Sequence, residues 1–280
     1  MEKWPIGVFT SIDAGLGVKL EVASELQIPT IQLHAPAKAT RTQENADKFL
    51  ARLSELGITL TAVFGGFAGE SYADIPTVVK TVGLVPPDTR AERTTEMKEI
   101  ADFAKMLGCS VVALHLGFIP HDTSDPLYGE IIDVTRDVCD HCKSNGQSLH
   151  LETGQESADG LLQFIGDVER DNLFVNFDPA NMILYGTGEP IEALKKVGEY
   201  VRSIHCKDAK WAATPGQEWG EEVPLGDGEV GIENYLRTLD EIGYAGPLTI
   251  EREIPQEPDR QKAEINHASS LLSDVKSKLA

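Results

Sequence analysis

The feature that most constrains the fold of this chain is a repeated alternation of short apolar runs with helical segments. Each of eight runs has four to six residues rich in Val, Ile, Leu, Phe or Thr, which is typical of buried parallel strands. The runs are Trp4–Phe9, Thr30–His34, Thr59–Phe64, Val111–Leu116, Ser148–Glu152, Leu173–Asp178, Ser203–Lys207 and Leu248–Glu251. The segments between them place apolar residues at helical spacing, as in the stripe of Ala46, Phe49 and Leu53 before Gly57.

Eight strands alternating with helices predict a closed parallel (β/α)8 barrel, the TIM barrel. A doubly wound parallel sheet is the competing fold, but evenly repeating units without a linker favour closure. A length of 280 residues suits one such barrel, so we expect residues 1–280 to form a single domain. The connections 65–89 and 209–231 are too long for simple turns. Both follow strands at the end where barrel active sites lie, so we expect them to be functional.

Composition narrows the classes of function. The formal net charge of −20 repels phosphate backbones and argues against a nucleic-acid partner. A hydrophobic content of 41% supports a sizeable core, but no apolar run approaches the roughly 20 residues that span a bilayer. The N-terminal residues lack a basic segment and a cleavage site, so we expect no secretory signal. Four cysteines do not make a disulfide scaffold, and the sequence predicts a cytoplasmic protein without a membrane partner.

The last four predicted strands each end in a residue that can bind a metal ion. These residues are Glu152, Asp178, His205 and Glu251, separated by 26, 27 and 46 residues. Side chains alternate between the two faces of a strand. On all four strands the register that turns the apolar neighbours toward the helices turns the ionisable residue into the mouth of the barrel. The neighbours concerned are Leu151, Phe177, Ile204 and Ile250.

Four such residues in one mouth favour a metal site over simple hydration of polar strand ends. Three carboxylates packed together raise one another's pKa values, and a divalent cation removes that cost. Three carboxylate oxygens and one imidazole nitrogen form a fairly hard ligand set. We therefore expect one divalent ion, Mn²⁺ or Mg²⁺ in the first place, whereas Co²⁺ and Zn²⁺ also fit this ligand set.

The segments LETG, FDPAN, IHCKD and TIERE, which hold these four residues, resemble the sugar phosphate isomerase/epimerase family. This family comprises the xylose isomerase-like barrels, including ketose 3-epimerases and inosose isomerases, and the resemblance covers essentially the whole chain. It implies that Glu152, Asp178, His205 and Glu251 hold a divalent metal. It also implies that Glu152 and Glu251 are catalytic and move a proton on and off a carbon beside a carbonyl.

The chain departs from the family at one position that bears on function. Many members carry a histidine three residues after the aspartate of the sixth strand, where this chain has Asn181. In the related DNA-repair endonucleases that histidine and an Asp-x-His pair after the seventh strand build a trinuclear zinc site. This chain has Trp211 and Ala212 in the second region, so a single metal is expected and an endonuclease-like protein is left only as an outside alternative.

Seven further residues are candidate substrate contacts. His34, His115 and Lys207 are expected to point into the mouth, although each could instead satisfy a polar or charged neighbour. Aromatic rings in the mouth can stack on the C–H faces of a sugar or can pack the long loops. The full set is His34, Phe64, His115, Asn181, Lys207, Trp211 and Trp219.

These features leave three hypotheses. The first is a metal-dependent isomerase or epimerase that transfers a proton through an enediolate of a sugar, keto-sugar or cyclitol. The second is a lyase or dehydratase that acts on a keto-sugar or inosose through the same proton removal. The third is a non-catalytic carbohydrate- or metal-binding barrel. We expect a small carbohydrate as the partner, and the sequence leaves open whether the chain forms a homo-oligomer.

Overall fold

A computed structural model describes residues 3–12, 17–253 and 257–279 of the chain. Eight parallel strands form a closed barrel, because the last strand pairs with the first, Ile6 opposite Leu248. In spatial order the strands are β1 (Ile6–Ser11), β3 (Thr30–His34), β4 (Thr59–Gly65), β5 (Val111–Leu114), β6 (Ser148–Glu152), β7 (Leu173–Phe177), β8 (Val201–Cys206) and β11 (Leu248–Ile250). The pairing of β11 with β1 excludes a doubly wound sheet and confirms the predicted (β/α)8 barrel.

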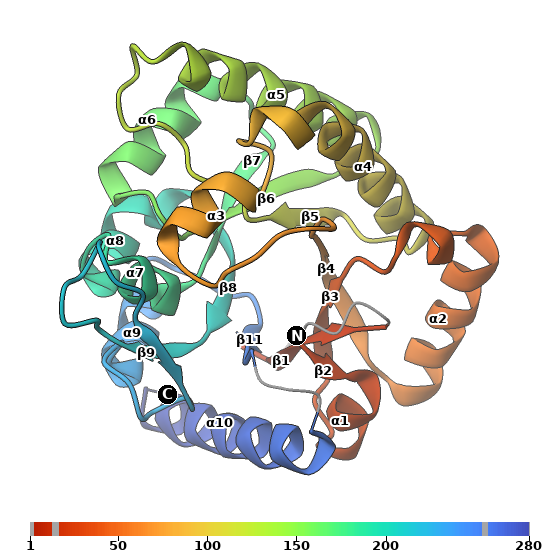
Figure 1. Cartoon of the computed structure of the whole chain (residues 1–280). Coiled ribbons are helices and arrows are strands. Elements are labelled where there is room, and N and C mark those ends of the chain that lie inside the picture. The colour runs from red at the N-terminus through yellow and green to blue at the C-terminus, as the bar shows by residue number, and fades with distance from the viewer. Residues whose placement is uncertain (1–2, 13–16, 254–256, 280) are drawn as a thin grey trace.

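Helices surround the ring of strands (Figure 1). They are α1 (Leu20–Glu25), α2 (Gln43–Leu56), α3 (Ile75–Thr81), α4 (Pro87–Met106), α5 (Pro126–Ser144), α6 (Ala158–Val168), α7 (Pro179–Tyr185), α8 (Pro190–Val197), α9 (Ile232–Glu241) and α10 (Pro258–Leu279), with 3-10 turns at Lys38–Thr40 and Gly198–Tyr200. Local signals set their ends: Thr42 accepts from Asn45 N at the start of α2, and left-handed Gly57 ends it as predicted. No helix in the described part of the chain is long and apolar enough to cross a membrane.

The first predicted strand is displaced by two residues, for a local reason. The sequence predicts a strand over Trp4–Phe9, whereas β1 covers Ile6–Ser11. Trp4 has a positive φ of 56°, which no strand residue adopts, and its indole donates to the carbonyl of Tyr244. Trp4 therefore closes the end of the barrel remote from the predicted site instead of entering the sheet.

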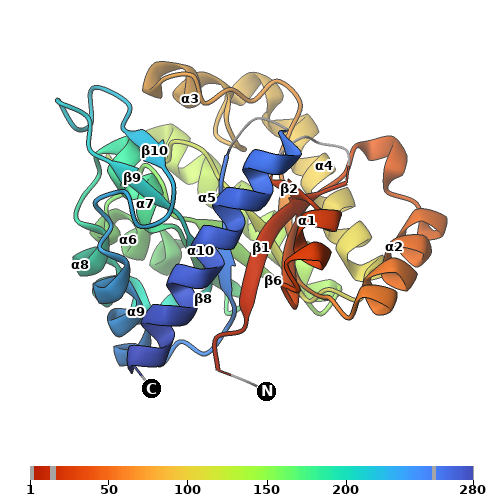
Figure 2. The same ribbon diagram turned by 90° about the horizontal axis from the view of Figure 1, so that it is seen from below.

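Both long connections contain secondary structure that the sequence analysis did not predict. The segment after β4 holds α3, and the segment after β8 holds an antiparallel hairpin of β9 (Asp208–Lys210) and β10 (Glu221–Val223). A further two-residue strand, β2 (Val18–Lys19), pairs with the end of β1. Figure 2 shows α3 and β10 at one end of the barrel and both chain termini at the other. The two insertions therefore lie at the end where the carboxyl ends of the strands meet.

The barrel strands separate apolar from polar residues by face, as the alternation predicts. Outward-facing residues such as Leu151, Phe177 and Ile204 belong to the apolar core, which also includes Ile131 and Phe164 of the helices. The interior is polar at the level of the site, and its buried side chains are Gln32, His150, Asn176 and His205. A polar interior is stable only where its groups bond to one another, as Gln32 does with His205 and Asn176.

Candidate metal centre

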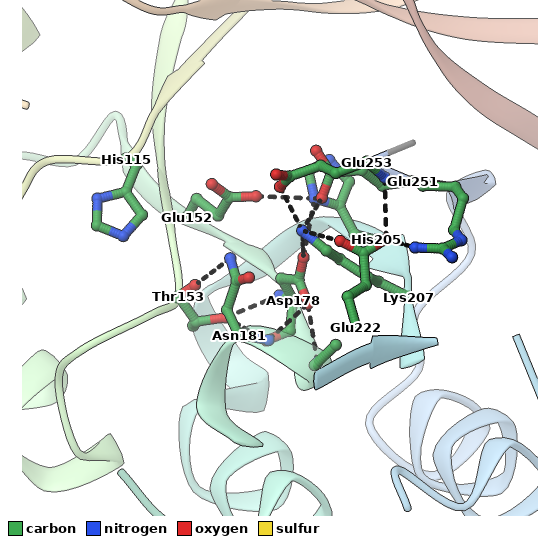
Figure 3. Close-up of polar contacts among 12 residues, drawn as sticks. His115, Glu152, Thr153, Asp178, Asn181, His205, Lys207, Glu222, Glu251 and Glu253 are labelled. Carbon is green, nitrogen blue, oxygen red and sulfur yellow. Dashed lines mark hydrogen bonds and ion pairs between the residues drawn. The ribbon is translucent and has the colours of Figure 1, made fainter. Parts of the chain in front are cut away.

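The four predicted ligand residues meet at the mouth of the barrel (Figure 3). One ligand atom from each of Glu152, Asp178, His205 and Glu251 lies within 4.8 Å of all the others. His205 Nδ1 is at the centre, 2.8 Å from an oxygen of Glu152, 3.1 Å from one of Glu251 and 3.4 Å from one of Asp178. His205 and Asp178 are fully buried, whereas the two glutamates are about one-tenth exposed and reach the solvent side of the cluster.

The backbone of helix α7 fixes the orientation of Asp178. Its Oδ1 accepts hydrogen bonds from the N–H groups of Ala180 at 2.8 Å and Asn181 at 3.0 Å, so this aspartate is the N-cap of α7. Pro179 occupies the first position of the helix, where its missing N–H costs nothing. The other oxygen, Oδ2, is buried and has no hydrogen-bond partner among the described residues, and it faces His205.

The tautomer of His205 is fixed from behind by Gln32. His205 Nε2 lies 2.8 Å from Gln32 Oε1, and Gln32 in turn donates from Nε2 to Asn176 Oδ1. A carbonyl oxygen only accepts, so Nε2 carries a proton and Nδ1 is the nitrogen that faces the carboxylates, where a proton or a metal ion can bind. His205 Nδ1 and Asp178 Oδ2 are both buried and have no hydrogen-bond partner among the described residues, and a cation satisfies such a pair of atoms. The residues present therefore fit a divalent metal ion.

Burial and mutual repulsion shift the pKa values of the cluster apart. Burial, assisted by the charge of Glu251, raises the pKa of Glu152 to about 7. Burial also raises the pKa of Glu251, but the charges of His205 and Lys207 outweigh it and hold the pKa of that carboxyl well below its usual range. For His205 the effect of burial is outweighed by Glu251 and the other carboxylates, which raise its pKa. In this cluster protons and a divalent ion compete for the same lone pairs.

Lys207 lies behind Glu251, outside the lining of the cavity. Its ammonium is 3.1 Å from Glu251 Oε2 and 2.7 Å from Glu253 Oε1, and the side chain is almost fully buried. The neighbouring carboxylate of Asp208 does not pair with Lys207 but accepts N–H bonds from the turn before α9, including those of Gly226 and Val230. Lys207 thus neutralises the acidic cluster and orients Glu251, and its pairing with Glu253 matches the alternative of a charged neighbour; its contact with substrate stays a prediction.

A cavity at the mouth brings the glutamate pair together with most of the predicted contacts. Its lining residues are Phe9, Gly17, His34, Phe64, Gly65, Gly66, Glu70, Tyr72, His115, Glu152, Asn181, Tyr185, Glu251 and Glu253. The lining includes four of the seven predicted substrate contacts: His34, Phe64, His115 and Asn181. Glu70 and Tyr72 come from the connection after β4, which supports the prediction that this long segment is functional.

The two predicted tryptophans are not among the described residues that line this cavity. Trp219 packs edge-on against Tyr185, with ring centroids 4.6 Å apart. Trp211 packs against the apolar core, and its backbone N–H donates to the carboxylate of Glu229. The reason is the course of the β9–β10 hairpin, which packs on α7 instead of folding over the mouth. Trp219 therefore supports the wall of the cavity from outside, through Tyr185.

Two residues that matter for the site were not singled out from the sequence. Gln32 precedes His34 by two residues on the same strand, so alternation places it on the same inward face one layer deeper. Strand alternation alone therefore indicates that Gln32 faces the interior of the barrel. The second residue is Tyr185, whose contact with His115 links residues 70 positions apart and so leaves no local signal in the sequence.

A closed parallel barrel whose mouth gathers three carboxylates and an imidazole defines a TIM-barrel protein with a candidate metal site. The family model described as a xylose isomerase-like TIM barrel matches residues 20–271. The chain belongs to this family, as the resemblance in the sequence implies.

Two solved structures are similar to this chain to very different degrees. The crystal structure of a xylose isomerase domain protein from Planctomyces limnophilus is 61% identical, covers 99% of each chain and has a TM-score of 0.97. The structure of an L-ribulose 3-epimerase covers 100% of this chain and 97% of that one, with 17% identity and a TM-score of 0.71. At that identity the likeness shows the fold alone.

The matches to curated proteins are shorter. An inosose dehydratase from Clostridium botulinum is 26% identical over 115 residues, 37% of this chain and 38% of its own length. An uncharacterised protein from Methanocaldococcus jannaschii is 25% identical over 167 residues, 55% of each chain. The chain thus matches about half or less of the length of these curated relatives.

Proposed function

We propose that this chain is a divalent-metal-dependent isomerase or epimerase of a sugar, keto-sugar or cyclitol. The observation that carries the proposal is that Glu152 and Glu251 belong to the candidate metal cluster and also line the cavity. Figure 3 shows them on either side of the cluster, with His205 and Asp178 between and below them. Two carboxylates on different sides of a bound carbon can remove a proton and return one.

The ligands Glu152, Asp178, His205 and Glu251 would hold Mn²⁺ or Mg²⁺, and the set also accepts Co²⁺ or Zn²⁺. When bound, the ion supplies Lewis-acid stabilisation of the negative charge that develops on a carbonyl oxygen. Asp178 and His205 face the cluster from fixed positions, set by the cap of α7 and by Gln32. In the proposed site Asp178 and His205 hold the metal ion in place, and the two more exposed glutamates face the substrate.

The proton transfers fall to the two glutamates. In the proposed reaction one of the two glutamates, as a carboxylate, takes a proton from the carbon beside the carbonyl, and the other, in its protonated form, returns one. Return to the opposite face of the same carbon gives an epimer, and return to the adjacent carbon gives an isomer. Lys207 holds Glu251 in place through its contact at 3.1 Å, and the rings of Phe9 and Phe64 cover the apolar side of the substrate and exclude water.

A dehydratase is the second candidate, because an inosose dehydratase matches this chain over 115 residues. It would use the same proton removal, followed by loss of a hydroxyl group from the neighbouring carbon. The two candidates differ in the mass of the product. An epimer or isomer keeps the mass of the substrate, whereas dehydration removes one water.

Solvent-deuterium exchange tests the proposal. Metal-loaded protein is incubated in D₂O with a panel of ketoses, aldoses and inososes, and each compound is analysed by NMR and mass spectrometry. We expect metal-dependent deuterium incorporation at a carbon beside a carbonyl, lost in Glu152→Gln. It should persist in Glu156→Gln, a buried glutamate outside the lining of this cavity. Absence of exchange with every carbohydrate, with Mn²⁺ or Mg²⁺ bound, would contradict the proposal.

A further inference from the structure

In the wall of the cavity, a buried histidine and a buried tyrosine form a hydrogen-bonded pair. His115 Nε2 lies 3.0 Å from the hydroxyl oxygen of Tyr185, and the backbone N–H of Gly117 donates to His115 Nδ1 at 3.2 Å. Both side chains are buried and both line the cavity with Glu152 and Glu251. Figure 3 shows His115 beside the acidic cluster, on the side of Glu152.

The bond from Gly117 fixes which nitrogen of His115 carries a proton. A backbone N–H can only donate, so Nδ1 must present its lone pair. Burial lowers the pKa of His115 to about 4, so the ring is neutral near neutral pH and its one proton is on Nε2. Nε2–H therefore donates to the oxygen of Tyr185. The hydroxyl hydrogen of Tyr185 is left to point elsewhere, and no second hydrogen-bond partner of this hydroxyl occurs among the described residues.

Neighbouring groups hold the tyrosine ring in this orientation. Trp219 packs edge-on against it at 4.6 Å between ring centroids, and Phe118 packs in the same manner at 5.7 Å. Gly154, two residues after Glu152, allows the pair to approach the end of β6. A Cβ at that position would lie 2.7 Å from His115 Nε2 and 3.3 Å from Tyr185 Cε2. The glycine of the LETG segment is thus explained by the space that this pair occupies.

We propose that Tyr185 donates a hydrogen bond to an oxygen of the substrate and that His115 is the positioning residue that turns this donor into the cavity. The inference rests on the proposed function and narrows its substrate class. The substrate must carry a hydroxyl or carbonyl oxygen, as an acceptor, in addition to the oxygens that meet the metal end of the cavity. A site that presents a fixed donor discriminates against an analogue that lacks this oxygen, because the donor is then left unpaired.

Equilibrium binding tests the donor separately from catalysis. The probes are ribitol, xylitol and L-ribulose, titrated into magnesium-loaded protein by calorimetry. We expect Tyr185→Phe to weaken binding of the polyol or ketose that wild type binds by about tenfold, as loss of one hydrogen bond to a bound oxygen does. Tyr244→Phe is the matched control, because it removes a buried tyrosine hydroxyl that bonds to Pro247 remote from the mouth.

Variants of His115 test its positioning role. His115→Gln keeps an N–H donor at the end of the side chain and should retain most of the affinity for the probe. His115→Leu removes the donor and should weaken binding of the probe as much as Tyr185→Phe does. The double variant His115→Leu/Tyr185→Phe should be no weaker than either single variant, because both remove the same interaction. Nitrogen-15 NMR of the wild-type protein should show His115 as the neutral Nε2–H tautomer, which a merely space-filling role does not require.

The outcomes separate this inference from the proposed function. Binding that depends on Tyr185 without deuterium exchange supports the donor and overturns the isomerase proposal. Exchange with unchanged affinity and unchanged kcat/KM in Tyr185→Phe overturns the donor and leaves the isomerase proposal standing. An Nδ1–H tautomer or a charged His115 at neutral pH also overturns it, as does failure of all three probes to bind.

Discussion

The two halves of the barrel mouth differ in charge and in how their side chains are held. Strands β6, β7, β8 and β11 end in the acidic ligand cluster, whereas β1, β3, β4 and β5 end in rings: Phe9, His34, Phe64 and His115. Backbone caps and buried amides hold the charged half, as Asp178 and Gln32 show. Ring packing holds the other half, with Phe9 and Phe64 at 5.3 Å between centroids. We infer that the charged half performs the chemistry and the ring half binds the substrate.

The largest effect is expected in the charged half, from Glu152→Gln. The substitution removes a proton acceptor and one ligand charge while keeping the shape of the side chain. General acid–base groups contribute about 10²- to 10⁴-fold to the rate, so kcat for exchange should fall by about 10²-fold or more. The measurement is the initial rate of deuterium incorporation at saturating substrate and metal. A variant with kcat near that of wild type would contradict the division between the two halves.

The role of Gln32 in orienting the ligand His205 is tested by Gln32→Leu, which removes the acceptor for His205 Nε2–H. Loss of a partner that orients a ligand costs about 10- to 100-fold in metal affinity. Isothermal titration with Mn²⁺ measures this loss. Gln147→Leu serves as control, because Gln147 donates to the carbonyls of Ala101 and Cys109 away from the cluster. It should lower stability with unchanged metal affinity, and equal losses in both variants would contradict the role of Gln32.

The ring half is tested by Phe64→Leu, which keeps an apolar side chain but removes a flat surface. We expect KM to rise by up to about tenfold, because a lost aromatic contact is worth about 0.5–1.5 kcal/mol. The value of kcat should change less than twofold, since Phe64 moves no proton. Steady-state kinetics on the substrate found in the exchange panel provides both constants. A fall in kcat comparable to that of Glu152→Gln would contradict the comparison.

These outcomes bear on what the sequence could predict. Strand alternation predicts that four ligand residues point into one mouth, because the direction of each side chain depends only on its neighbours along the strand. These residues are Glu152, Asp178, His205 and Glu251. The partners that orient the ligands are not local: Gln32 and His205 are 173 positions apart. The tryptophans of the 209–231 segment were predicted to contact the substrate, but a hairpin that the sequence did not reveal carries them outside the cavity.

The last test concerns folding stability and not activity. It addresses the layer beneath the cluster, where His150 bonds to the hydroxyls of Ser148 and Ser203. Burial lowers the pKa of His150 to about 3 from a usual 6.5. As the pH falls through this window the unfolded chain takes up a proton that the folded chain does not, so folding stability decreases. The free energy of unfolding of wild type, relative to His150→Gln, should therefore fall by about 1 kcal/mol per pH unit below pH 6.5. Urea unfolding of the metal-free proteins measures it, and a pH-independent difference would contradict it.

The central claim is that Glu152, Asp178, His205 and Glu251 bind one divalent ion. Anomalous diffraction at the manganese edge, from crystals soaked in Mn²⁺, tests this claim most directly. We predict one strong peak within coordination distance of all four side chains, absent in crystals of Asp178→Ala. The absence of an anomalous peak at this position at saturating Mn²⁺, or a peak that persists unchanged in the variant, would contradict the claim.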